Sequence, residues 1–110
     1  RGYGFYRRAK ERNRDMVTWS APAKRDLREI HRYISLDSKF YARKVVETIV
    51  DKAELLSHSP RIGRVVPEIE DPNIREIFVY SYRLIYEIGS EEIQVLGVIH
   101  GRRDFFENLN

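Results

Sequence analysis

Arginines recur along the last third of the chain, at Arg75, at Arg83 and again in the segment HGRRD at residues 100–104. Guanidinium groups bind phosphate or carboxylate through paired hydrogen bonds, and strands hold such side chains rigidly. A histidine can in addition transfer a proton near neutral pH. We therefore predict a target- or anion-binding surface in this part of the chain, formed by Arg75, Tyr80, Arg83, His100, Arg102 and Arg103.

Each of these residues also has an interpretation without a ligand. Arg75 would lie opposite Glu87 if the turn between their strands is centred on Ser81, and an exposed ion pair of this kind contributes less than about 1 kcal/mol. Arg83, beside that turn, would share a face with Arg75. The HGRRD segment could be a charged strand end that discourages pairing with another sheet edge, with Asp104 orienting one guanidinium. The residues alone leave both interpretations open.

Three short β-prone runs must position these side chains. We predict strands over residues 74–80, 82–88 and 93–100, joined by two tight turns into an antiparallel meander. Tyr80 then lies at a turn, where it is free to contact a partner. Alternation along the middle strand places Tyr82, Leu84, Tyr86 and Ile88 on one face and Arg83, Ile85 and Glu87 on the other.

The residues before the meander predict one strand and two helices. A short strand starts at Met16, and a helix follows in which Ser20 caps the first turn and Pro22 occupies it. A second helix begins after Ser38 and runs to about Ser57, and the two helices pack as an antiparallel hairpin. Apolar residues recur at helical spacing in both, at Ala23, Leu27, Ile30 and Ile34 and then at Ala42, Val45, Val46, Ile49, Ala53 and Leu56.

These elements predict an α+β fold. Residues 60–73 hold three prolines and one glycine and are interpreted as a loop. The N-terminal strand, the helical hairpin and the three-stranded antiparallel meander then form a single domain over residues 16–110, with one sheet packed on the helices.

The basic charge is concentrated at the N-terminus. Residues 1–15 carry six basic and two acidic residues, whereas the other 95 residues carry 14 basic and 15 acidic ones. The domain therefore lacks the broad basic field that long-range attraction to nucleic acid requires. We interpret residues 1–15 as a basic extension that is disordered or vector-derived, or else as a native arm, with Met16 a candidate natural start.

Several classes of site find no support in the sequence. Cysteine is absent, and His31, His58 and His100 belong to different predicted elements, so we expect no metal site. No nucleotide-binding or serine-nucleophile motif occurs, and we expect no cofactor. No apolar run approaches the roughly 18 residues of a membrane span, and we expect a cytoplasmic protein.

Taken together and in order, the segments WSAPAKRDLREIHRYI, ARKVVETI, LLSHSPRIGRVVPE, REIFVYSYRLIYEI and VLGVIHGRRDF resemble the ParE/RelE superfamily. They cover about Val17 to Phe105. Members are the growth-inhibiting toxins of type II toxin–antitoxin systems, which also stabilise plasmids. The resemblance implies a cognate antitoxin as partner, a hetero-oligomer with it, and an exposed apolar groove between helices and sheet that receives an antitoxin helix or strand.

The resemblance implies one of two targets. RelE-like members are mRNA interferases, metal-independent endoribonucleases that cleave mRNA on the ribosome with basic residues of the sheet and an acid/base group near the C-terminus. ParE-like members instead inhibit DNA gyrase, without established catalysis of their own. A third possibility is an inactive member that only binds its antitoxin.

The RelE-type cleavage set is incomplete in this sequence. Arg83 matches its sheet arginine, Arg103 or Arg102 falls near the second, and Arg75 replaces a lysine. If the chain is an RNase, these arginines and His100 as a substitute acid/base group are the candidate catalytic residues.

Two further positions depart from that set. Ile77 stands where another basic residue is expected, and no tyrosine follows Arg103. Together with the long helical hairpin and the nearly neutral domain, these differences favour the ParE-like activity.

Overall fold

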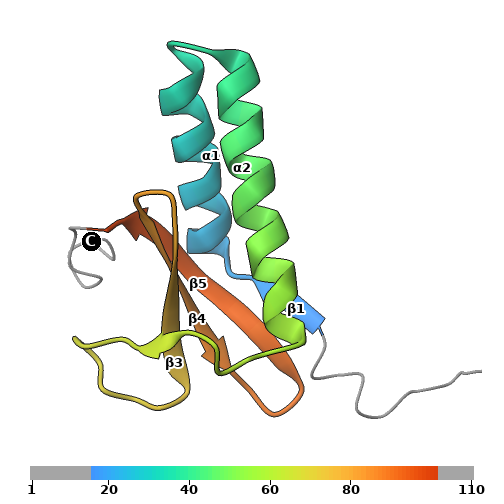
Figure 1. Cartoon of the computed structure of the whole chain (residues 1–110), viewed down its shortest axis with the longest axis vertical. Coiled ribbons are helices and arrows are strands. Elements are labelled where there is room, and N and C mark those ends of the chain that lie inside the picture. The colour runs from blue at the N-terminus through green and yellow to red at the C-terminus, as the bar shows by residue number, and fades with distance from the viewer. Residues whose placement is uncertain (1–15, 102–110) are drawn as a thin grey trace, which may run out of the picture.

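A computed structural model describes residues 16–101 of the 110-residue chain. The predicted N-terminal extension and residues 102–110 lie outside this range. In it, two antiparallel helices cover one face of a sheet and project beyond its end (Figure 1). The elements are β1 (Met16–Trp19), α1 (Ala21–Ser35), α2 (Lys39–Glu54), the 3-10 turn η2 (Leu55–Ser57), β2 (Arg64–Val65), β3 (Ile74–Val79), β4 (Tyr82–Ile88) and β5 (Glu92–His100).

Serine side chains start both helices, as predicted. The Ser20 hydroxyl accepts a hydrogen bond from the Ala23 N–H at 3.2 Å, and the Ser38 hydroxyl accepts one from the Tyr41 N–H at 3.0 Å. Each bond satisfies one of the backbone N–H groups that a helix leaves unpaired in its first turn. The predicted second helix changes to the 3-10 turn η2 at Leu55, slightly before the expected end.

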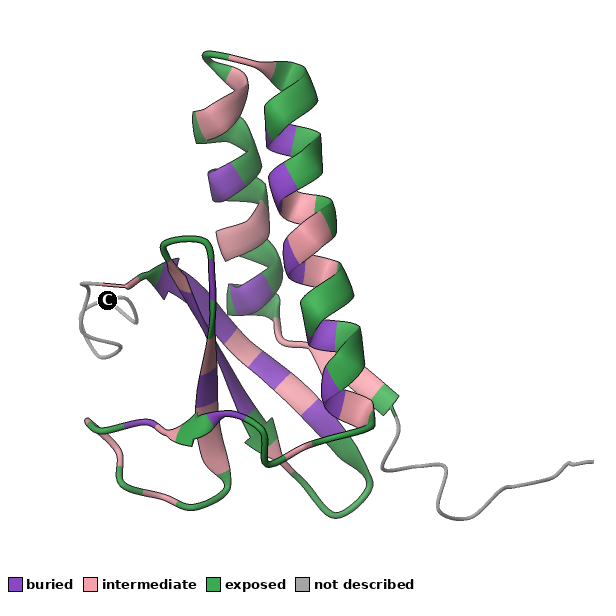
Figure 2. Ribbon diagram, in the orientation of Figure 1, coloured by how far each residue is buried: buried purple, intermediate pink, exposed green. Residues whose placement is uncertain are grey.

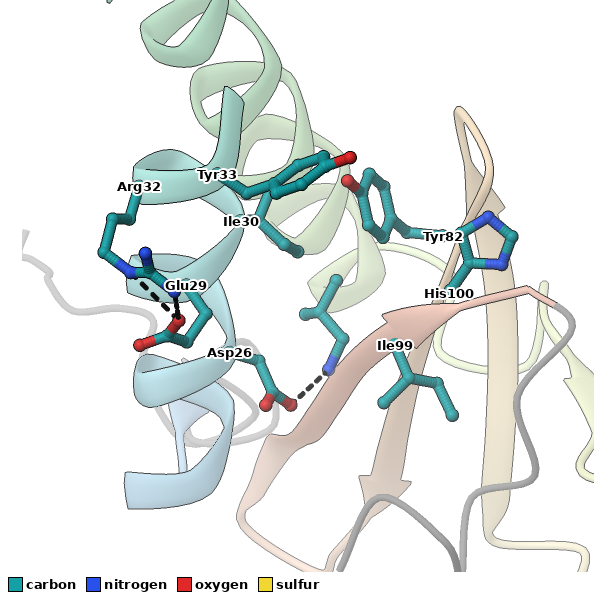
Figure 3. Close-up of a pocket in the computed structure, with 9 residues that line it drawn as sticks. Asp26, Glu29, Ile30, Arg32, Tyr33, Tyr82, Ile99 and His100 are labelled. Atoms are coloured by element: carbon teal, nitrogen blue, oxygen red, sulfur yellow. Dashed lines mark hydrogen bonds and ion pairs between the residues drawn. The ribbon is translucent and has the colours of Figure 1, made fainter. Parts of the chain in front are cut away.

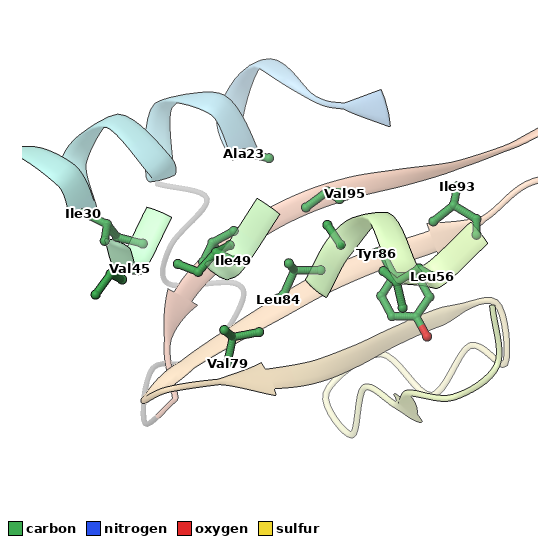
Figure 4. Packing of buried hydrophobic residues seen from close by; sticks show 12 residues of the cluster. Ala23, Ile30, Val45, Ile49, Leu56, Val79, Leu84, Tyr86, Ile93 and Val95 are labelled. Atoms are coloured by element: carbon green, nitrogen blue, oxygen red, sulfur yellow. The ribbon is translucent and has the colours of Figure 1, made fainter. Parts of the chain in front are cut away.

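The main core lies between the helical hairpin and the sheet. Ile49 of α2 and Leu84 and Tyr86 of β4 are fully buried there, and the apolar faces of both helices point inward as predicted (Figures 2 and 4). Burying one aliphatic side chain of this size contributes about 1.5–3 kcal/mol. A smaller cluster of Val66, Ile85 and Ile99 lies on the opposite face of the sheet.

The sheet contains five strands in the order β1-β5-β4-β3-β2, so the fold class is confirmed while the strand count is larger than the predicted four. The N-terminal strand β1 pairs in parallel with β5, and all other neighbours are antiparallel. A bulge between β4 and β5 inserts Leu96 as an extra residue, since Ile85 pairs with Gly97 and Tyr86 with Val95.

Residues 60–73 are not entirely a loop. Arg64 and Val65 form the short strand β2, which pairs with Glu76 and Arg75. Gly63 lets β2 approach, because a Cβ atom there would lie 2.5 Å from the Glu76 carbonyl oxygen and 2.7 Å from the Tyr86 hydroxyl. A two-residue strand among prolines carries too few alternating positions to be recognised.

The predicted pairing of Arg75 with Glu87 is wrong by one residue. Val79 pairs with Tyr82 across a turn of two residues, so Arg75 lies opposite Tyr86. Residues paired across strands share a face, and Arg75 is therefore on the helix-facing side with Tyr86. Because successive side chains alternate, Arg83 lies on the opposite face. The expectation that these two arginines share a surface is wrong as well.

Candidate functional site

The Arg83 side chain is held between two carboxylates on the sheet face opposite the helices. Its Nη1 and Nη2 atoms donate to the two oxygens of Glu68 at 2.9 and 2.8 Å, a two-pronged pair. Its Nε atom donates to Glu76 Oε1 at 2.7 Å. Glu76 in turn accepts a hydrogen bond from Arg64 Nε at 2.5 Å. The four residues form one network that joins β2, β3, β4 and the segment that follows β2.

Because Arg83 and Glu76 are buried, this network stabilises the fold and is not a surface for a ligand. Arg83 is 5% exposed and Glu76 only 1%. The hydrogen bonds that Arg83 donates to Glu68 raise the pKa of Arg83 above its ordinary value; burial acts in the opposite direction, and Glu76 adds to the increase. Removing one partner of a buried pair leaves an uncompensated charge, which costs about 3–5 kcal/mol. A phosphate ligand would therefore have to replace two carboxylates that already satisfy Arg83.

Arg75 binds the loop that precedes its own strand. Its Nε donates to the Pro72 carbonyl at 2.8 Å, and its Nη1 donates to the carbonyls of Gly63 at 2.9 Å and Arg61 at 3.5 Å. Three backbone oxygens from two separate loop segments thus converge on one guanidinium. The contacts tie the ends of the 61–73 segment together, which is a structural role for this cation.

Tyr80 lies in the turn between β3 and β4. Its φ is 55°, in the left-handed region that non-glycine residues rarely adopt. The side chain is exposed, and its hydroxyl donates to the Thr48 hydroxyl of α2 at 3.3 Å. The prediction that Tyr80 is at a turn and accessible to a partner is consistent with this position.

His100 ends β5 beside an open cavity of about 690 Å³ between α1 and the sheet. Its ring meets Tyr82 edge to face, with centroids 6.3 Å apart. Across the opening, Tyr33 of α1 lies with its hydroxyl toward that of Tyr82 (Figure 3). Asp26, also from α1, accepts a hydrogen bond from the Val98 N–H at 3.0 Å and fixes the helix to β5.

Electrostatics in this cavity favour the neutral form of the Tyr82 phenol. Burial raises the pKa of Tyr82, and the neighbouring Tyr33 raises it further. Arg32 at the rim is paired with Glu29 at 2.6 Å. The cavity thus combines an imidazole, two phenols and acidic groups, which are side chains that hydrogen-bond a polar partner or transfer protons.

The six predicted site residues do not form one described surface. Arg75 lies on the helix-facing side, Arg83 on the opposite face, and Tyr80 and His100 near the β3–β4 turn and the end of β5. Arg102 and Arg103 lie outside the described residues. Among residues 16–101, no three potential metal ligands come together and no helix has the length and apolarity to cross a membrane.

Sequence reasoning did not find the carboxylates that hold Arg83. A two-residue turn at residues 80–81 places Glu76 on the same sheet face as Arg83. The sequence therefore predicts this proximity once the strand register is correct. Glu68 lies in an irregular segment, where no periodicity predicts its direction. Tyr33 and Asp26 lie outside the apolar stripe of the first predicted helix, so the periodicity that predicts this helix does not single them out.

Comparison with known proteins decides the family. A family model described as the ParE toxin of the type II toxin–antitoxin system parDE matches residues 17–105. The chain belongs to this family. It is thus a type II toxin of the ParE/RelE superfamily, as the sequence predicts. Among curated proteins, none matches the chain significantly.

Solved toxin structures share the fold of this chain. The chromosomal ParDE system of P. aeruginosa is 25% identical, with a TM-score of 0.65, and the match covers 77% of this chain and 94% of that one. The RelBE2 toxin–antitoxin complex of Mycobacterium tuberculosis shares the fold at 22% identity, with a TM-score of 0.58 and coverage of 77% and 95%. The YoeB dimer of Staphylococcus aureus shares it at 13% identity, with a TM-score of 0.54 and coverage of 77% and 94%. The RelBE2 and YoeB matches show that the fold is shared.

Proposed function

We propose that this ParE-family toxin arrests growth by binding and inhibiting DNA gyrase in the cytoplasm and that a cognate antitoxin neutralises it. Its family model and the ParDE system in the comparison both support the ParE-like activity. Inhibition of this kind requires a binding surface and no reaction centre, so an incomplete cleavage set is no obstacle to it.

The single observation that carries this choice is the state of Arg83. This arginine matches the sheet arginine of the RNA-cleaving relatives in sequence, yet Glu68 and Glu76 occupy its guanidinium. Electrostatic catalysis needs donors already aimed at the position where charge develops, and here these donors are aimed at carboxylates. The arrangement favours a gyrase-binding toxin over an mRNA interferase.

An mRNA interferase is the second candidate, and the cavity beside His100 favours it. The imidazole of His100 and the phenols of Tyr82 and Tyr33 could transfer protons during attack of a ribose hydroxyl on the adjacent phosphate. In that mechanism the Arg83 guanidinium could stabilise the phosphate charge only after its hydrogen bonds to Glu68 and Glu76 break.

Two parallel assays on the purified full chain test the proposal. We expect inhibition of gyrase supercoiling with accumulation of gyrase–DNA cleavage complexes, and no cleavage of mRNA on programmed ribosomes. A Leu36→Glu variant at the exposed end of the hairpin and a His100→Ala variant serve as surface and cavity controls. Ribosome-dependent cleavage that His100→Ala abolishes, with gyrase unaffected, would overturn the proposal.

A further inference from the structure

Helix α1 presents a face of positive charge. Lys24 and Arg28 lie four residues apart and therefore one above the other, about 6 Å apart along the helix axis. Arg25 lies beside them, three residues before Arg28. All three side chains are exposed, and none lies on the side of the helix that is buried in the core (Figure 2). We refer to these three residues as the basic face of α1.

The carboxylates of α1 do not neutralise the basic face. Asp26 and Glu29 both line the cavity between α1 and the sheet (Figure 3). Glu29 pairs there with Arg32 at 2.6 Å, one turn beyond Arg28. Within residues 16–101, no salt bridge joins a residue of the basic face to a carboxylate. The three charges of the basic face are therefore open to an anion from outside the chain.

The positive charge works against the helix that carries it. Lys24 and Arg25 lie near the N-terminal end of α1, where the helix dipole favours anions and disfavours cations. No acidic residue occurs in the first turn of α1. Arg28 lies one turn from both cations, and like charges at this spacing repel each other. An anion bound at the basic face would relieve both unfavourable interactions.

Helix α2 has three exposed cations in a different setting, namely Lys39, Arg43 and Lys44. Glu47 follows Arg43 by four residues and Lys44 by three, so one carboxylate lies within a turn of both cations. By contrast, no carboxylate occurs three or four residues before or after Arg28. Of the two helices, α1 therefore has the more concentrated positive charge.

A phosphate backbone fits the basic face better than unpaired bases do. Lysine and arginine side chains bind phosphate oxygens without regard to base sequence. Proteins that bind single strands stack the bases on aromatic side chains. Tyr33 is the one tyrosine of α1, and it points toward Tyr82 in the cavity (Figure 3). Because residues 16–110 are nearly neutral overall, contact with a backbone at the basic face is short-ranged.

We propose that the basic face of α1 binds the phosphate backbone of duplex DNA. Its three side chains contact phosphate oxygens on one side of the duplex, and no base is read. In a complex with gyrase, the same face contacts the DNA that gyrase holds and adds to the affinity of the toxin for that complex. This last step rests on the proposed function, whereas binding to duplex DNA does not.

Fluorescence anisotropy on the full chain tests the site, with a fluorescein-labelled DNA duplex of about 20 base pairs as the probe. We expect saturable binding that weakens as the salt concentration rises. The triple variant Lys24→Gln, Arg25→Gln, Arg28→Gln should weaken binding by at least about tenfold at low salt. It should also reduce the slope of log K against log salt concentration by about 3, since each lost phosphate contact contributes about 0.9.

The matched control removes the same charge from α2, through Lys39→Gln, Arg43→Gln and Lys44→Gln. It should change binding by less than about twofold. Both variants retain residues 1–15, so the basic charge of that segment contributes equally to both measurements. Circular dichroism checks that both variants fold. Equal losses for the two variants would show that net charge alone decides binding and would overturn the site. So would absence of duplex binding, or a loss confined to a single-stranded RNA of the same length.

The gyrase assay separates this site from the proposed target. The α1 variant should raise the toxin concentration that gives half-maximal accumulation of cleavage complexes by at least about fivefold. Duplex binding that depends on the basic face, together with failure to inhibit gyrase, would retain the site and overturn only the target. Gyrase inhibition at full strength by the α1 variant would retain the target and overturn the DNA contact within that complex.

Discussion

Arg83 shows how the chemistry of one residue depends on its neighbours. In sequence it is a strand arginine suited to a phosphate, but in the fold it is nearly buried and shared between Glu68 and Glu76. A guanidinium in that position links the segment after β2 to the centre of the sheet. Arg83 therefore stabilises the fold. Removal of Glu68 or Glu76 should lower the free energy of unfolding, whether or not the chain has bound a target.

Replacing Glu76 tests this role at the residue scale. Glu76→Gln keeps the size of the side chain but removes a fully buried negative charge between Arg83 and Arg64. We expect the free energy of unfolding to fall by about 3 kcal/mol, as for other broken buried pairs. Urea denaturation measures it. Glu68→Gln, on a partly exposed partner, should cost less, and equal small losses for both variants would contradict a structural role.

The close approach of β2 to the sheet is the clearest feature at the scale of elements. Gly63 leads into β2, its N–H donates to the Tyr86 hydroxyl at 3.0 Å, and the same hydroxyl donates to the Pro60 carbonyl at 2.6 Å. Arg75 holds the Gly63 carbonyl from the other side. A strand of two residues forms few backbone hydrogen bonds with its neighbour. These side-chain contacts therefore supply much of the interaction that holds β2 against β3.

A methyl group at Gly63 should displace this segment. In Gly63→Ala the new Cβ would lie 2.5 Å from the Glu76 carbonyl oxygen, which is backbone and cannot rotate away. We expect a loss of about 2 kcal/mol in unfolding free energy, typical of overpacking, and faster hydrogen exchange at Arg64 and Val66. Gly89→Ala is the control, because its Cβ would meet a single oxygen at 3.0 Å. Exchange rates unchanged by Gly63→Ala would refute the argument.

The difference between predictable and unpredictable elements is physical. Both helices and the three meander strands were recognisable because their apolar periodicity is sustained over many residues. The β3–β4 register was missed by one residue because a non-glycine residue, Tyr80, adopts a left-handed conformation in a two-residue turn. The parallel pairing of β1 with β5 joins residues more than 70 positions apart, and no local pattern encodes it. Arg75 and Arg83 lie on opposite faces for the same reason, since the face of a side chain follows the register.

At the scale of the whole molecule, the helical hairpin has two different ends. Near the sheet its apolar residues are buried in the main core. At the far end large apolar side chains remain exposed on and between the helices (Figure 2), namely Tyr33, Leu36, Phe40 and Tyr41. The hairpin projects beyond the end of the sheet, and this surface lies on the projecting part (Figure 1). The isolated chain therefore presents an apolar surface at the far end of the hairpin.

Those exposed side chains should make the isolated toxin self-associate, since contiguous apolar patches of this kind are rare on monomers. The double variant Leu36→Glu and Phe40→Glu places charge on side chains that are 76% and 67% exposed, so we expect less self-association in sedimentation velocity. The free energy of unfolding should change by no more than about 0.5 kcal/mol, because these positions contribute little to the core. A matched variant, Glu47→Gln on α2, should leave association unchanged. If the double variant lowers stability strongly while association persists, the hairpin end is part of the folding core and the surface lies elsewhere.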